Sequence, residues 1–291
     1  IGWLECLAVG VKQNHVSGSE LFRPERLRVN RLLKHQPAPQ RLQLQAAAKS
    51  CLLQQSLLEK CLLSIQTAEL IRQGSYQDTL REKPDAITEP GRPDKPELVP
   101  PNQLKSRKLG SVLGRVSLLH AIAHIEFNAI NLAWDAIYRF PAMPDQYYLD
   151  WASVAHDETR HFSMLNSRLQ QLGYQYGDFP AHNGLWEMAL KTQHDITARM
   201  ALVPRVLEAR GLDVTPGMIE RLDQIGDPES AGILRLILSE EVRHVEIGSR
   251  WFAYLCEREG RQMEASFLTF VNEYARGSVR LPMNRPARMA A

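Results

Sequence analysis

Apolar residues recur at helical spacing over most of the chain from residue 112 onward. Side chains three and four positions apart share one face of an α-helix, and the apolar positions follow that period rather than the alternation typical of strands. Long helices are expected over residues 112–140, 151–172, 183–209 and 228–258, and shorter ones over 216–224 and 261–275. Four long helices with short or moderate connections predict an all-α fold, built on a four-helix bundle with additional N- and C-terminal helices.

Prolines separate an N-terminal segment from this main body. Six of them fall within residues 84–101, and proline both fixes φ and removes a backbone donor, so an extended, non-helical stretch is expected there. The expected organisation is a helical segment that packs on the bundle, a proline-rich extended linker, and the bundle with its C-terminal helix, over residues 1–83, 84–110 and 111–291 respectively.

The N-terminal segment is rich in helix-forming residues. Leu, Gln, Ala and Lys abound between Arg41 and Gln73, and Gly74 follows as a stop, so one long helix is expected, preceded by a short helix over 24–34. Leucine pairs at 52/53, 57/58 and 62/63 mark an apolar stripe on the long helix. We expect this stripe to pack on the main body, and a separate interaction surface is the alternative.

Composition and charge narrow the function classes without selecting one. The 35 basic and 33 acidic side chains give a formal net charge of +2, which indicates neither a nucleic-acid nor a membrane surface. No apolar run reaches the ~18–20 residues of a membrane span. The apolar opening lacks a basic flank and a clear cleavage site, so no signal peptide is expected. Four cysteines without a C-x-x-C pair argue against a zinc ribbon and suit the cytoplasm, the expected location.

Four of the expected apolar helix faces contain carboxylates, although an unpaired buried charge costs several kcal/mol. The first and third long helices each carry one such glutamate, Glu126 and Glu208. The second and fourth each carry a Glu-x-x-His pair, whose two side chains share one helix face. These pairs are Glu158 with His161 and Glu241 with His244.

This set of residues matches the ligands of di-iron and di-manganese carboxylate bundles, in which two helices give one Glu each and two give Glu-x-x-His. The set also repeats along the chain, because the lone glutamates are 208 − 126 = 82 residues apart and the paired ones 241 − 158 = 83. Oxygen and imidazole donors suit iron or manganese. Two copies of one helix hairpin are therefore expected to hold two Fe (or Mn) ions per chain.

Two further acids accompany the histidines. Asp157 and Glu240 each precede their own histidine by four residues, one helical turn, where a carboxylate can accept from the imidazole nitrogen that does not bind metal. The alternative is that both are surface acids paired with nearby arginines. Pro204, one turn before Glu208, is expected to kink the third helix or open its hydrogen-bond ladder. Such irregularities often accompany functional sites.

Other candidates fit the pattern less well. His194 and Asp195 offer an alternative ligand, but their spacing to Glu241 suits a bundle less than that of Glu208. His182 is expected to cap a helix, and the alternative is that it borders a substrate entrance. The loop that contains it, 174–184, is expected either to cover one end of the bundle as a lid or to be an ordinary connector.

Several long stretches carry a resemblance to a known family. They are EPGRPDKPELVPP (89–101), HAIAHIEFNAINLAWD (120–135), DWASVAHDETRHF (150–162), YGDFPAHNGLWEMA (176–189), VPRVLEARGLDVTPGMIERL (203–222) and EEVRHVEIGSRWF (240–252). In these stretches the chain resembles a bacterial ferritin-like family described as a domain of unknown function. The resemblance implies a ferritin-like bundle and a metal site, and it implies no substrate. The ligands it implies are Glu126, Glu158, His161, Glu208, Glu241 and His244.

The expected function is an O₂-activating oxidase or oxygenase that acts on an unidentified organic substrate. Its expected partners are O₂, that small molecule and an electron-donor protein. A homodimer is expected, and neither a membrane nor a nucleic acid is. The alternative is a ferroxidase-type iron-binding or metal-buffering protein. An oxygenase needs a closed apolar pocket beside the metals, whereas a ferroxidase needs an acidic path to the surface and a large symmetric assembly.

Single residues argue against particular groups of di-iron carboxylate proteins. A ribonucleotide-reductase small subunit has a radical tyrosine about one turn after its first histidine ligand, where this chain has Leu165. Hydrocarbon monooxygenases have a threonine one turn after the third-helix glutamate, where this chain has Leu212. A tRNA-modifying di-iron hydroxylase shares the bundle, but the net charge of +2 gives it little support.

Overall fold

The computed structural model describes residues 42–77, 84–105, 107–276 and 283–291, which belong to one compact unit. The short helix expected over 24–34 lies outside these residues. Within the described part, the extended pairings are an isolated bridge and two parallel two-residue strands, β1 (Leu42–Gln43) and β2 (Tyr76–Gln77). The all-α fold class is confirmed.

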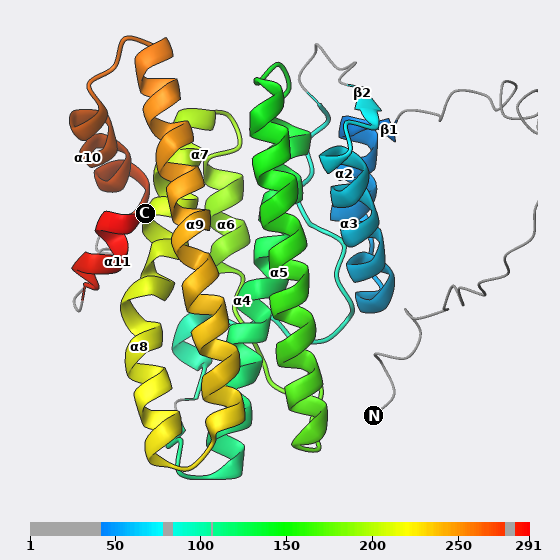
Figure 1. The fold of residues 1–291 in the computed structure, drawn as a ribbon, viewed down its shortest axis with the longest axis vertical. Coiled ribbons are helices and arrows are strands. Elements are labelled where there is room, and N and C mark those ends of the chain that lie inside the picture. Colours follow the sequence, from blue (N-terminus) through cyan, green and yellow to red (C-terminus); the bar gives the residue numbers. More distant parts are fainter. Residues whose placement is uncertain (1–41, 78–83, 106, 277–282) are drawn as a thin grey trace, which may run out of the picture. The chain divides into compact units, whose positions relative to one another are not determined.

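Two helix hairpins form the four-helix bundle (Figure 1). The first hairpin consists of α4 (Val112–Arg139) and α5 (Asp145–Gln171). The second consists of a composite rod and of α9 (Pro228–Arg258). The rod is α7 (Ile196–Leu202), a π-helical turn η3 (Val203–Glu208) and α8 (Ala209–Gln224) in direct succession.

Local signals explain where the long helices begin and end. Ser111 caps α4 by accepting from the Gly114 amide, and Asp227 caps α9 by accepting from the Ser230 amide. Gly173 follows α5 with φ +82°, a left-handed conformation that glycine adopts without steric strain. The expected bounds of α9 agree with the structure, whereas α5 begins six residues earlier than the expected 151.

The expectation of one long N-terminal helix is wrong. The chain forms α2 (Leu44–Leu53) and α3 (Leu57–Arg72), with a break at residues 54–56. The break exists because the buried Lys60 ammonium folds back onto the last carbonyls of α2, at Cys51 and Leu52, and also donates to Asn131 of α4. Since a helix end leaves its carbonyls without intrahelical partners, a cation there is stabilising.

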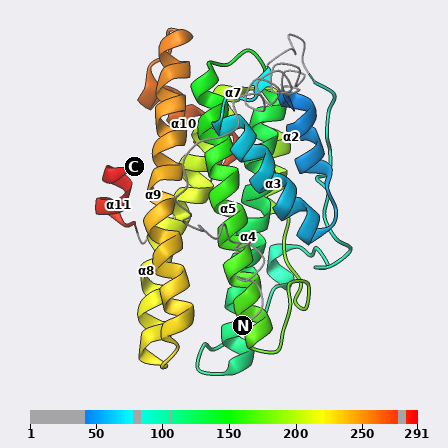
Figure 2. The same cartoon turned by 45° about the vertical axis from the view of Figure 1, so that its right-hand side comes forward.

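The two N-terminal helices lie against the first hairpin, α2 on α4 and α3 on α5 (Figure 2). The leucine stripe packs only in part. Leu52 is fully buried, but Leu58 and Leu62 are more than half exposed on α3.

The expected third helix is also divided differently. Residues 184–191 form a separate helix, α6 (Gly184–Lys191), and α7 starts anew at Asp195, whose carboxylate accepts from the Thr197 and Ala198 amides. At its far end the rod does not stop at Gly211, because α8 continues through Pro216 to Gln224. A glycine costs about 1 kcal/mol in a helix interior, and the packing of α8 against α9 outweighs that cost.

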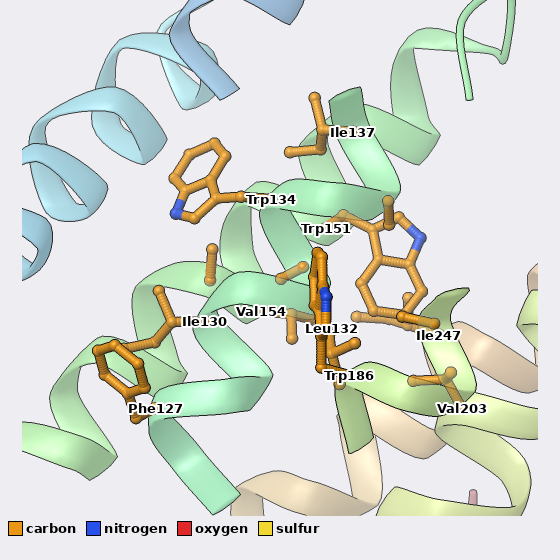
Figure 3. Close-up of a cluster of buried hydrophobic side chains, with 14 of the residues drawn as sticks. Phe127, Ile130, Leu132, Trp134, Ile137, Trp151, Val154, Trp186, Val203 and Ile247 are labelled. Atoms are coloured by element: carbon orange, nitrogen blue, oxygen red, sulfur yellow. The ribbon is translucent and has the colours of Figure 1, made fainter. Parts of the chain in front are cut away.

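The extended proline-rich stretch is bound to the helices. The Thr88 carbonyl accepts from the Trp186 indole, and the Ile87 carbonyl accepts from Arg139. Figure 3 shows Trp186 in the core together with Trp134 and Trp151. All three indole side chains are buried, which agrees with the packing role typical of such residues.

Two short helices, α10 (Met263–Tyr274) and α11 (Arg285–Ala290), follow the bundle. They lie along the second hairpin (Figure 1). A membrane crossing needs a long, apolar helix, and the described residues contain none.

Candidate metal centre

The glutamates and histidines singled out in the sequence meet inside the bundle. Donor atoms of Glu126, Glu158, His161 and Glu241 all lie within 4.8 Å of one another. His244 Nδ1 lies 3.0 Å from Glu158 Oε1. The side chains come from α4, α5 and α9, so only the assembled bundle brings them together.

Glu208 joins this cluster from the last residue of η3. It lines one cavity together with Glu126, Glu158 and Glu241, and its Oε2 atom is hidden from solvent. All six residues predicted from the sequence therefore surround one space, which we call the buried centre.

The buried centre has an approximate two-fold arrangement. Glu158 lies between the two imidazoles, with Oε2 3.4 Å from His161 Nδ1 and Oε1 3.0 Å from His244 Nδ1. Glu241 Oε1 is 3.8 Å from His161 Nδ1 and 3.4 Å from His244 Nδ1. The ring centroids are 5.9 Å apart. Two carboxylates thus occupy the space between the histidines, the position that bridging ligands take in a two-metal site.

None of the four carboxylates of the buried centre forms an ion pair with a lysine or arginine of the described residues. Elsewhere in this bundle a buried acid is neutralised by the protein itself. Asp135 is fully buried and is bound by Arg139 at 2.6 Å and Arg199 at 2.5 Å. In the buried centre the four carboxylates have, among the described residues, only the two histidines as partners, too few to balance four buried negative charges.

Three polar atoms of the buried centre are hidden from water and form no hydrogen bond of normal geometry within the described part of the chain, although two of them lie near charged neighbours, His244 Nδ1 3.0 Å from Glu158 Oε1 and Glu158 Oε2 3.4 Å from His161 Nδ1. They are Oε2 of Glu158, Oε2 of Glu208 and Nδ1 of His244. Orphaned buried donors and acceptors are rare in native proteins and call for a specific explanation. Carboxylate oxygens and imidazole nitrogens are the donors that iron and manganese accept. The buried centre could therefore hold a metal.

Without a metal, protons have to balance part of this negative charge. Burial and the neighbouring Glu241 and Glu158 carboxylates raise the pKa of Glu208 to about 8. Burial also raises the pKa of Glu126 well above its ordinary value. For His161, burial acts in the opposite direction, but hydrogen bonds to Glu126 and Glu158 raise the pKa to about 11. A metal ion would displace such protons when it binds.

The two acids predicted to orient the histidines do contact them, but not within the same helix. Glu240 of α9 lies 2.7 Å from His161 Nε2 of α5, and Asp157 of α5 lies 3.3 Å from His244 Nε2 of α9. The same-helix pairing expected from the four-residue spacing is thus wrong. Because α5 and α9 lie side by side, each acid faces the histidine of the other helix.

Arginines complete this crossed arrangement. Arg160 binds Glu240 at 2.5 Å, and Arg243 binds Asp157. Each acid therefore accepts from one imidazole and from at least one guanidinium, because Asp157 also accepts from Arg160 at 3.4 Å. The two alternatives weighed from the sequence, orienting acid and partner of an arginine, are thus both correct. The result is that each Nε2 is engaged and each Nδ1 faces the buried centre, a common way to fix the orientation of a metal-binding imidazole.

The irregularity predicted at Pro204 is confirmed as the π-helical turn η3, which ends at Glu208. Proline lacks the N–H that an α-helix would use, which opens the ladder. Gly248 of α9 makes room for this turn, since a Cβ at Gly248 would lie 2.2 Å from Pro204 Cγ. Gly248 was not singled out in the sequence. Its position in the sequence, one helical turn after His244, could have pointed to Gly248.

A cavity of about 140 Å³, which we call the central cavity, adjoins the carboxylates of the buried centre. Apart from the four glutamates and Arg210, its walls are almost entirely apolar, with side chains from α4, α6, η3, α8 and α9. Examples are Ile122, Ala129, Leu207, Val214, Leu234 and Ile237. The α8 side chains were missed in the sequence because the third helix was expected to close at Gly211.

The other candidates lie elsewhere. Asp195 caps α7, and the His194 ring lies against Tyr274, so neither faces the buried centre. The prediction that His182 caps a helix is confirmed, because its Nδ1 accepts from the amide of Gly184, the first residue of α6. In the same loop, Tyr176 is buried and donates to or accepts from His124 Nδ1 at 2.8 Å.

Comparisons with known proteins place the chain among relatives without an assigned role. A family described as "Protein of unknown function (DUF455)" matches residues 53–291. An "Uncharacterized protein" of Haemophilus influenzae is 46% identical over 206 residues, which cover 68% of this chain and 72% of that protein. No solved structure is significantly similar.

The contact between Gly248 and Pro204 leads to a testable difference between two glycines of α9. Replacing Gly248 with alanine forces η3 to move, and such overpacking typically costs about 1–3 kcal/mol of unfolding free energy. A methyl group at Gly232 would meet no described residue within 4 Å, so Gly232→Ala should gain up to about 1 kcal/mol through helix propensity. Urea denaturation of both variants measures the difference. Equal stabilisation by both would contradict the tight approach of Pro204.

Proposed function

The chain belongs to the family described as "Protein of unknown function (DUF455)", and we propose that it is a ferritin-like di-metal oxidase or oxygenase. The residues that would hold two Fe (or Mn) ions fall into three pairs. Glu126 with His161 would serve one ion, Glu208 with His244 the other, and Glu158 with Glu241 would lie between them.

Charge supports two ions rather than one. Four carboxylates carry a formal charge of about −4 when ionised, and two divalent cations offset it without any lysine or arginine. One divalent cation would leave two negative charges that protons would still have to balance. The crossed acid and arginine pairs do not help, since their charges balance each other outside the buried centre.

The apolar central cavity is the observation that carries the proposed activity. Two reduced ions, when bound, supply electrons to O₂ and so permit oxidation of an organic molecule. The chain's own residues then have distinct tasks. Asp157 and Glu240 hold the imidazoles in place, and the apolar walls exclude water and orient a substrate beside the carboxylates.

The same cavity disfavours the alternative, a ferroxidase or metal buffer. Iron in transit needs a path lined with acids. Among the described residues, the lining of the central cavity contains no carboxylate beyond the four of the buried centre, so no row of acids leads iron outward along its walls.

Iron titration tests the proposed function. Full-length protein titrated anaerobically with Fe(II) should bind about two ions per chain, and exposure to O₂ should then consume about one O₂ per ion pair. An oxygen electrode together with elemental analysis measures both quantities. The reaction should stop once the bound pair is oxidised.

Two outcomes would count against this proposal. Protein that takes up less than one iron or manganese ion per chain, or that holds only zinc, lacks the proposed centre. Continued oxidation of Fe(II) far beyond two ions per chain would instead favour the ferroxidase.

A matched pair of glutamates in α9 tests the orienting acids. Glu240→Gln should weaken Fe(II) or Mn(II) binding about 10–100-fold, because the amide no longer fixes the His161 ring with a charged acceptor. Glu229 also pairs across helices with an arginine of α5, Arg168, but contacts no histidine of the described residues. Metal affinity of Glu229→Gln should stay unchanged in chelator competition. A similar loss in both variants would show that Glu240 has no special role.

A further inference from the structure

A second cavity, of about 170 Å³, adjoins the central cavity on the outer side of α4. We call it the outer cavity. Its walls are the segment before α4, the exposed face of α4 and the loop before α6. Ile125 and Leu185 line both cavities, so the two spaces are neighbours.

The outer cavity carries positive charge. Lys105 and Arg107 line it, and among the described residues no carboxylate lines it or forms an ion pair with either of them. The Arg107 guanidinium is also held in place, because it donates to Ser117 Oγ at 2.7 Å and lies 5.4 Å from the centre of the Phe179 ring. A positioned guanidinium without an acidic partner is well suited to a carboxylate or a phosphate.

The central cavity offers the opposite environment. Its walls are apolar, and its volume of about 140 Å³ is close to that of engineered apolar cavities that accept benzene. A hydrocarbon portion of roughly six carbons therefore fits. An anionic group fits these apolar walls poorly, because Arg210, the arginine that lines them, is paired with Asp213 at 3.5 Å.

From these two neighbouring spaces we propose that the substrate is a small amphipathic anion. Its apolar portion enters the central cavity beside the buried centre, and its anionic group stays in the outer cavity on Arg107 and Lys105. The assignment of this ligand as a substrate rests on the proposed oxidase or oxygenase function. The binding itself does not, since it depends only on the two cavities.

The orientation of the ligand follows from the charges. Apolar walls in the central cavity and the cations Lys105 and Arg107 in the outer cavity align the molecule with its hydrocarbon end toward the centre. The bound ligand would pass Ile125 and Leu185, which line both cavities. Oxidation would therefore fall on a carbon distant from the anionic group.

Calorimetric titration of the full chain with three six-carbon probes tests this proposal. Hexanoate and hexyl phosphate carry the anionic group, and hexan-1-ol lacks it. Charge-assisted hydrogen bonds should make at least one of the anions bind about 10–100-fold more tightly than the alcohol. Whichever anion binds more tightly identifies the headgroup as a carboxylate or a phosphate.

Variants then locate the two ends of the ligand. Arg107→Met and Lys105→Met should weaken anion binding about tenfold or more and leave hexan-1-ol unchanged. Lys108→Met is the matched control, because it removes one nearby charge that does not line the outer cavity. Ala129→Leu fills the central cavity and should weaken all three probes, with its melting curve checked for intact folding.

Specific results would overturn the proposal. Hexan-1-ol binding as tightly as both anions, or equal losses in Arg107→Met and Lys108→Met, would show that the outer cavity does not select an anion. Metal analysis of the same samples separates this failure from that of the proposed function. If the chain selects anions but binds no metal, only the proposed oxidase or oxygenase function is contradicted. If the chain binds metals but does not select anions, only the assignment of the ligand is contradicted.

Discussion

Four carboxylates buried around one point, with no lysine or arginine of the described residues to neutralise them, are the constraint on which the rest of this structure depends. Burying even one unpaired charge is strongly unfavourable, and the chain supplies arginines freely elsewhere, as it does for the buried Asp135. The bundle therefore concentrates negative charge where a cation from outside the chain would stabilise it. The four glutamates come from four different elements, α4, η3, α5 and α9. The site therefore forms only when the bundle assembles.

The buried centre has two unlike sides, one made of hydrogen-bonded imidazoles and one that opens on an apolar cavity. On the imidazole side, Asp157 and Glu240 hold the histidines, and Arg243 and Arg160 hold the acids. On the carboxylate side lies an apolar cavity. One side thus holds the imidazoles in place, and the other leaves an open apolar space beside the carboxylates.

Much of this could be predicted from the sequence, for reasons that particular residues make clear. The bounds of α9 follow from local signals, with Asp227 as cap and Pro228 at the first turn. The six residues of the buried centre stood out because acids interrupt apolar stripes at repeated spacing. The break after α2 could not be predicted, since it depends on the contact of Lys60 with Asn131, 71 residues away. The crossed pairing of Asp157 and Glu240 was likewise hidden, because spacing along one helix says nothing about a neighbouring helix.

The most direct test of the account is to locate the metals themselves. Crystals of protein loaded anaerobically with Fe(II) should give two anomalous-difference peaks at the iron absorption edge, roughly 3.5–4 Å apart. Both peaks should lie between His161 and His244, with Glu158 and Glu241 in contact with each. Fully occupied crystals with no peak inside the bundle, or with Glu158 and Glu241 bound instead by lysine or arginine side chains, would contradict the account.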